Sequence, residues 1–502
     1  MHLCRRLSFF LAILISLAPV TGAAYSLLTH EQLIDLTWQD SIVPLLTSRY
    51  PNLTAAGLQE ARAYAYGGCV VQDIGYYPYG DRFISNLTHY VRSGDFIVAL
   101  FRNAKTANEL AFAIGALSHY ISDSIGHSEA TNLAVPLEFP ALKERYGPVV
   151  SYAEGKHQHV QIELGFDIDQ MAHQRVAPLR FQREVGLKVP VRLLSESFYQ
   201  TYGVTHFSGR NGRFNVREYR FAVHAFIPRV DGALTLLHRG HEPADPKSPD
   251  TLEIEKEFAQ TSAANNWDTY SRRASVREYF LAGLIFVLPK VGPLALVNAK
   301  NPTPKTESDY MYSLMQSLDA LRTALHRFTP PPTQGAPDPP TAGDPLPDGD
   351  RVATRDQEQK SPAADPQTGD DAQKPAPAAK LPLDRPSERR KSDRDPHHPL
   401  PNRDLDTGHV VQPSGYPLTD DTYADLLHRL TLTPQQPIPP GIVEDIQMYY
   451  ANLDAPFATK KIAKRWNQVL RDLETLALMP TSLAPEPYPT YGDAEAEDSG
   501  TD

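Results

Sequence analysis

The chain has 502 residues, with 49 Lys and Arg against 60 Asp and Glu, so its formal net charge at pH 7 is −11. This acidic balance argues against a strongly basic protein that holds nucleic acid through its phosphates. Hydrophobic residues make up 41% of the chain, enough for a real core in two to four domains or in one large domain with long appendages.

The first 24 residues have the features of a secretory signal peptide. Arg5 and Arg6 precede an apolar run at residues 9–15, and residues 22–24 (Gly-Ala-Ala) supply small side chains for cleavage. The apolar run is too short to span a bilayer comfortably. We therefore predict export to the periplasm or the extracellular space, with an uncleaved N-terminal anchor as the alternative.

Cleavage after residue 24 would change both the charge and the cysteine content. It would remove Arg5, Arg6 and Cys4, leaving a formal net charge of −13 and Cys69 as the remaining cysteine. No intramolecular disulfide can then form. An exported protein of this kind must be stabilised by its core or by metal.

The segment from Thr106 to Asn132 carries the strongest pattern in the chain. Thr106 and Glu109 have the spacing of a capping box, which predicts a helix start. Apolar residues then recur at helical spacing: Leu110, Ile114, Leu117 and Ile121. The helix is expected to end near Gly126.

His119 and Asp123 lie four residues apart on this helix, and His127 follows Gly126, giving the pattern H-x-x-x-D-x-x-x-H. Side chains four apart project from one side of a helix, and imidazoles with carboxylates are zinc ligands. Alone, such a pair is as easily a surface pair or a cap. A second pair, His159 and Glu163, favours metal binding, whereas His157 is offset by two residues and points elsewhere.

Three further candidates are ambiguous individually. Thr29 and Gln32 suggest another capping box, so His30 falls in a first helical turn, where it could chelate a metal together with a free amino group at Tyr25. Asp73 follows a second predicted helix in a loop rich in Gly, Tyr and Pro, and could bind a metal, take a proton or simply form a turn. His89 lies at a helix edge.

Together these residues provide five imidazoles and three carboxylates, mostly on or beside predicted helices. Four ligands close a structural zinc site, so eight suit a cluster of two or three ions with open positions. We predict an all-α, multi-helix bundle with a metal cluster in a cleft. The ligand candidates are His30, Asp73, His89, His119, Asp123, His127, His159 and Glu163.

The order and local contexts of these residues resemble the zinc-dependent phospholipase C family and its relatives, the zinc-dependent single-strand nucleases. The resemblance covers residues 25–172 and is carried by THY around His89, LSHYISD around His119, and the later H-x-x-x-E. Both groups are all-α and hold three zinc ions in a cleft.

The resemblance implies a ligand set for each ion. One zinc would be held by Asp73, His89, His119 and Asp123, and a second by His127, His159 and Glu163. A third would be held by His30, by the amine and carbonyl of Tyr25, and by Asp123. Asp73 would also be the catalytic general base for the attacking water.

Two features bear on the substrate. The family begins its mature chain with Trp, whereas Tyr25 is expected to be first here. The short interval from Tyr25 to His30 resembles the nucleases, and Glu163 in place of Asp resembles the phospholipases. The acidic charge favours phospholipid or another phosphoester as the substrate. We expect no stable binding of nucleic acid. A transient contact with a membrane surface is possible.

The implied function is that of an exported zinc-dependent phosphoester hydrolase of phospholipase C type. A metal-activated water would attack the phosphorus of a phospholipid head group. Two alternatives stay open, a single-strand nuclease or phosphodiesterase on the same fold, and a non-catalytic zinc-stabilised binding module.

The rest of the chain divides by composition. Residues 25–185 form the predicted catalytic core and 186–328 its helical extension, which includes an apolar run at 279–297 that is either a core helix with a turn or a lipid-contacting lip. The remaining parts are a Pro-rich, disordered linker (329–412), a C-terminal helical unit (413–482) and an acidic tail (483–502). The C-terminal helical unit either packs on the core or stands alone.

Overall fold

The computed structural model describes residues 27–77, 80–207, 209–238, 248–270, 274–287, 298–328, 400–439, 441–453 and 460–481. Every regular element in these ranges is a helix, and the β-type pairs found there are isolated bridges of Arg403 with Val410 and of Ile438 with Thr481. The predicted all-α fold is confirmed.

The segment that carries the predicted site contains α2 (Leu27–Thr37), α3 (Val43–Arg49), α4 (Ala55–Gly68), α5 (Arg82–Tyr90), α6 (Ser93–Asn103), α7 (Ala107–Gly126), α8 (Asn132–Glu138), α9 (Pro140–Tyr146) and α10 (Tyr152–Ala172). Short irregular turns join some of these helices. They are a 3-10 turn at Val71–Gly75 and π-helical turns at Trp38–Ile42 and His127–Thr131.

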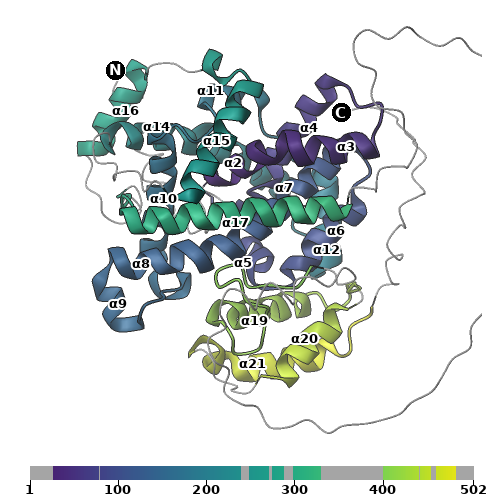
Figure 1. Cartoon of the computed structure of the whole chain (residues 1–502). Coiled ribbons are helices and arrows are strands. Elements are labelled where there is room, and N and C mark those ends of the chain that lie inside the picture. The colour runs from purple at the N-terminus through teal and green to yellow at the C-terminus, as the bar shows by residue number, and fades with distance from the viewer. Residues whose placement is uncertain are drawn as a thin grey trace, which may run out of the picture. The chain divides into compact units, whose positions relative to one another are not determined.

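The later helices are α11 (Leu179–Val185), α12 (Val191–Tyr202), α13 (Gly209–Phe221), α14 (Ile227–His238), α15 (Pro249–Ala264), α16 (Val276–Val287), α17 (Pro304–Phe328), α19 (Pro417–Thr431), α20 (Ile442–Ala451) and α21 (Lys460–Leu476). A π-helical turn at Ala222–Phe226 and a 3-10 turn at Trp267–Tyr270 complete this part. Figure 1 shows α17 running across the bundle and α19–α21 gathered near α5.

Helix α7 lies at the centre of the bundle, in contact with α4, α6 and α17. Its close approach to α4 depends on glycine, because a Cβ at Gly115 would lie 2.2 Å from the carbonyl oxygen of Ala65. Thr106 caps the helix as predicted, accepting a hydrogen bond from the Glu109 amide at 3.2 Å. The Glu109 carboxylate reaches the amide of Lys105 at 2.8 Å rather than that of Thr106.

The start of α2 differs from the prediction. The helix begins at Leu27, and Asp167 of α10 accepts hydrogen bonds from the backbone amides of Leu28 (2.9 Å) and Thr29 (3.2 Å). The predicted capping box at Thr29 is therefore wrong, because the Thr29 hydroxyl donates to Asp167 at 2.8 Å. A carboxylate stabilises a helix N-terminus, and this one ties the helix of His30 to the helix of His159.

The C-terminal helices pack on the core. Leu426 and Leu427 of α19 are fully buried in the same hydrophobic cluster as Leu87 of α5. The helical unit therefore packs back on the bundle, which was one of the two arrangements that the sequence left open.

The segment just before α19 corrects the predicted linker. Residues 329–399 lie outside the described ranges, but residues 400–412, which composition assigned to the linker, lie against the bundle. The Leu405 side chain is fully buried, and its amide donates to the carbonyl of His89 at 3.1 Å. Average composition missed this contact because a few apolar residues, Leu400, Leu405 and Val411, anchor a stretch that is mostly polar.

The apolar run at 279–297 is described only to Val287. Helix α16 packs on α14 through buried Ala282 and Ile285, whereas Phe280 and Phe286 are 63% and 71% exposed. None of the helices in the described ranges is both long and apolar enough to cross a membrane.

Candidate metal centre

The centre is built on α7, which presents His119 and Asp123 on one side. The Nε2 atom of His119 lies 3.1 Å from Oδ2 of Asp123, and both side chains are fully buried. The predicted pair therefore lies inside the bundle rather than on its surface.

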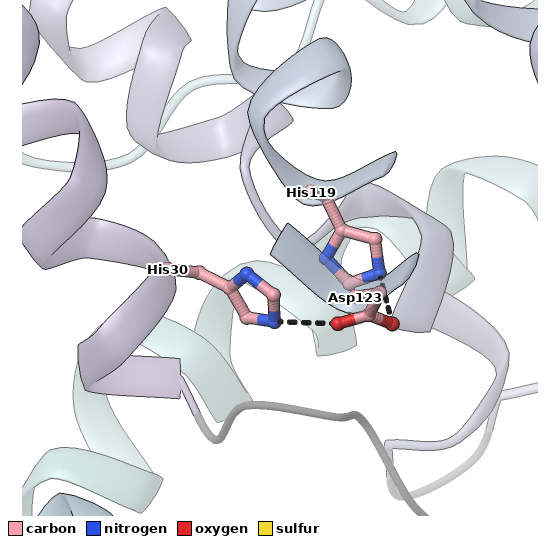
Figure 2. Close-up of side chains that lie close together, drawn as sticks. All are labelled: His30, His119 and Asp123. Atoms are coloured by element: carbon pink, nitrogen blue, oxygen red, sulfur yellow. Dashed lines mark ion pairs between the residues drawn. The ribbon is translucent and has the colours of Figure 1, made fainter. Parts of the chain in front are cut away.

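His30 of α2 faces the other oxygen of the same carboxylate. Its Nε2 atom lies 3.4 Å from Oδ1 of Asp123, as Figure 2 shows. The rings of His30 and His119 stack with their centroids 4.3 Å apart. Asp123 is thus held between imidazoles from two helices.

His89 approaches the second oxygen of Asp123, and Asp73 lies beside His89. Asp73 lies in the 3-10 turn and His89 near the end of α5. The Nε2 atom of His89 is 3.3 Å from Oδ1 of Asp73 and 3.3 Å from Oδ2 of Asp123. The two oxygens of Asp123 therefore face two different sets of ligand candidates.

His127, His159 and Glu163 form a second group, in which one ligand atom from each residue lies within 4.8 Å of the others. Helix α7 ends at Gly126 as predicted, and His127 starts the π-helical turn that follows it directly. Such turns are frequent at functional sites. The Nδ1 atom of His159 lies 3.9 Å from Oε1 of Glu163 on α10.

An oxygen atom fixes one ring nitrogen of four of these histidines. The pairs are His30 Nδ1 with Ser122 Oγ (3.0 Å), His89 Nδ1 with Ser85 O (2.7 Å), His119 Nδ1 with Cys69 O (3.0 Å) and His159 Nε2 with Val150 O (2.8 Å). A carbonyl oxygen only accepts, so the nitrogen bonded to it carries the proton. When such a ring is neutral, its other nitrogen keeps the lone pair that a metal-binding histidine uses.

Burial affects the pKa values of this second group differently from those of the first group, which comprises His30, Asp73, His89, His119 and Asp123. Burial lowers the pKa of His159 to about 4 and that of His127 well below its usual value, so both rings are neutral near pH 7. Burial also acts to lower the pKa of His89, but the carboxylates of Asp123 and Asp73 outweigh it and raise the value to about 10.

The two carboxyls of the first group shift in opposite directions. Burial raises the pKa of Asp73. Burial acts in the same sense on Asp123, but the surrounding imidazoles, chiefly His119, outweigh it and hold the pKa of that carboxyl well below its usual value. Asp123 is therefore anionic in the buried centre.

The donor set fits a metal ion. Among the described side chains, both oxygens of Asp123, Oδ1 of Asp73 and the Nδ1 atoms of His127 and His159 are buried and make no hydrogen bond. Each buried polar atom that is left without a hydrogen bond lowers the free energy of unfolding by about 1–3 kcal/mol. Several of them converging on shared points indicate a cation, and nitrogen with carboxylate oxygen suits zinc.

A further set of three residues, Asp169, His173 and Glu307, has similar residue types, but a cation already lies beside it. The buried guanidinium of Arg175 lies 3.1 Å from Oε1 of Glu307 and 4.0 Å from Oδ2 of Asp169. These residues are an ion-pair network that joins the end of α10 to α17.

The structure brings together eight of the nine residues named from the sequence, and Tyr25 lies outside the described ranges. Sequence reasoning missed Ser122, the carbonyl groups that orient the rings, and Asp406, which lies 3.6 Å from His127. Backbone carbonyls carry no sequence signal. For Asp406 the available signal was the apolar residues around it, Leu400, Leu405 and Val411, in a stretch that is mostly polar.

A buried, helix-borne cluster of imidazoles and carboxylates defines a class of metal-binding all-α proteins. Comparison narrows that class, because residues 29–209 match the family described as zinc dependent phospholipase C. All eight clustered residues lie in this segment, and the predicted resemblance is confirmed there. No curated protein and no solved structure matches the chain.

Replacing a residue of either group should release zinc. We predict that His119→Ala and His159→Ala each lower the zinc bound per chain, because each removes a buried nitrogen donor. Metal analysis of the purified, dialysed protein measures this. His157→Ala is the matched control, since His157 is exposed two residues before His159. Full zinc content in both ligand variants would contradict the assignment.

Proposed function

We propose that the chain is a zinc-dependent phosphoester hydrolase of phospholipase C type that acts on the head group of a phospholipid. The observation that carries this proposal is that one oxygen of Asp123 faces His30 and the other faces His89 and His119. The family match over residues 29–209 supports the phospholipase C class.

Three ions are proposed, with the ligands that the resemblance implies. Asp73, His89, His119 and Asp123 would hold one, and His127, His159 and Glu163 the second. His30, Asp123 and the backbone of Tyr25 would hold the third. When bound, zinc lowers the pKa of a water molecule toward about 7 and screens the negative charge of a phosphate.

Asp73 is the proposed general base. Its Oδ1 atom is buried beside His89, in the same group as His119. The carboxylate orients the water and accepts its proton as the water oxygen bonds to phosphorus. The phosphorus–oxygen bond to the leaving alcohol breaks, and that alcohol oxygen takes up a proton.

The acidic charge of the chain favours phospholipid over nucleic acid as the substrate. A single-strand nuclease of the same fold is the second candidate, because the interval from Tyr25 to His30 is short as in the nucleases. In a third reading the metal is structural and the C-terminal helices bind a partner.

Activity assays separate these functions. We expect the zinc-loaded chain to hydrolyse phosphatidylcholine, to leave single-stranded DNA intact, and to lose activity with a chelator. Asp73→Asn should lower turnover by about 100-fold or more, the usual range for a lost general base, with the zinc content of the variant measured in parallel. Turnover of DNA alone would favour the nuclease, and turnover of neither substrate would favour the non-catalytic reading.

We also propose that the protein is exported and begins at Tyr25, from the charge and apolar pattern of residues 1–24. N-terminal sequencing of the protein recovered outside the cytoplasm tests this, and Tyr25 is the expected first residue. A chain that keeps residues 1–24 would contradict the proposal and would leave the third ion without the free amine of Tyr25.

Helix α16 is the proposed membrane contact. Tyr279, Phe280 and Phe286 are 56%, 63% and 71% exposed, and aromatic side chains stabilise proteins at a lipid interface.

The double variant Phe280→Ser/Phe286→Ser should bind phosphatidylcholine vesicles several-fold more weakly in a co-sedimentation assay. Leu432→Ser, at a leucine that is 59% exposed beyond α19, is the control and should bind as the unchanged protein does. Equal binding by all three proteins would exclude α16 as the contact.

A further inference from the structure

We infer that Asp406, which lies far beyond the family-matched segment, orients His127 and thereby sets the zinc affinity of the group His127, His159 and Glu163. The inference rests on the proposed zinc-binding role of that group. It makes the C-terminal part of the chain a component of the metal centre.

The Asp406 side chain is buried and held from three directions. Its Oδ2 atom accepts hydrogen bonds from the hydroxyls of Tyr90 (2.9 Å) and Tyr416 (2.6 Å). Its backbone carbonyl accepts from Nδ2 of Asn132 at 2.7 Å. The remaining oxygen, Oδ1, lies 3.6 Å from Nε2 of His127.

The turn that carries Asp406 is also fixed. The Asp404 carboxylate accepts hydrogen bonds from the amides of Asp406 (3.0 Å) and Thr407 (3.2 Å). Gly408 adopts a φ of 71° and is pressed against α7, where a Cβ would lie 2.3 Å from the carbonyl oxygen of Ser124. The carboxylate is thus placed by the backbone.

His127 differs from the other four histidines of the centre. Each of those has one nitrogen held by an oxygen, whereas Nδ1 of His127 is buried without a hydrogen bond to any described residue. Asp406 stands opposite the other nitrogen, Nε2. It supplies for His127 the oxygen that Val150 supplies for His159, and leaves Nδ1 as the metal donor.

Asp406 orients the ring of His127 and is not itself a ligand of the metal. Asp406 is not among the residues whose ligand atoms lie within 4.8 Å of one another in this group, and two tyrosine hydroxyls already engage its second oxygen. A separation of 3.6 Å is longer than a hydrogen bond, so a small rotation of the ring would be needed to form one when Nδ1 takes a metal. Asp406 is therefore a positioning residue.

Zinc affinity, measured on the full chain by competition with a chelator, tests the inference. Asp406→Ala should weaken one bound zinc by about 10- to 100-fold, the usual effect of losing such an orienting carboxylate. Asp406→Asn should restore most of the affinity, since an amide oxygen still accepts from Nε2–H and the tyrosine hydroxyls can accept from its amide nitrogen.

A double variant identifies the ion concerned. His159→Ala removes the same site, so Asp406→Ala/His159→Ala should hold as much zinc as His159→Ala alone. Asp425→Ala is the matched control, because Asp425 lies in α19 and pairs with Lys461 at the surface. Thermal unfolding of the zinc-free proteins shows whether each variant is folded.

Three results would overturn the inference: unchanged zinc affinity in Asp406→Ala, equal losses in the Ala and Asn variants, or loss of a further ion in the double variant. If Asp406→Ala binds zinc with unchanged affinity while His159→Ala loses zinc, this inference fails but the proposed function stands. If His159→Ala also keeps its full zinc, the proposed function fails with it.

Discussion

The structure depends on one buried charge. The Asp123 carboxylate is fully enclosed, and imidazole nitrogens of His30, His89 and His119 lie within 3.4 Å of its oxygens. A buried carboxylate without compensation is strongly destabilising, so the fold needs positive charge at this point. A zinc ion bound here would supply that charge and would use the ring nitrogens that face the carboxylate, so that metal binding and folding would be parts of one equilibrium.

The helices are arranged so that donors distant in sequence reach this charge. Glycine at position 115 lets α7 lie close to α4, and Asp167 of α10 fixes the start of α2, which carries His30. Residues 400–411 then cover the site, with Leu405 bonded to His89 and Asp406 beside His127. The centre is therefore assembled from the N-terminal helices and from residues 400–411, although the family match ends at residue 209.

Helical spacing made part of this arrangement predictable. His119 with Asp123, and His159 with Glu163, are four residues apart, so any helix through them places each pair on one side. Their convergence came from the resemblance, since periodicity gives no distance between helices. Asp406 was out of reach because 279 residues separate it from His127, and the cap at Asp167 was missed because it joins α10 to α2 through a tertiary contact.

Anomalous diffraction at the zinc absorption edge, from crystals of the zinc-loaded protein, tests the central claim most directly. The account predicts two zinc ions bridged by Asp123, one on the His30 side and one on the side of His89 and His119, with a further ion at His127, His159 and Glu163. A map with no zinc within bonding distance of the Asp123 carboxylate would contradict it.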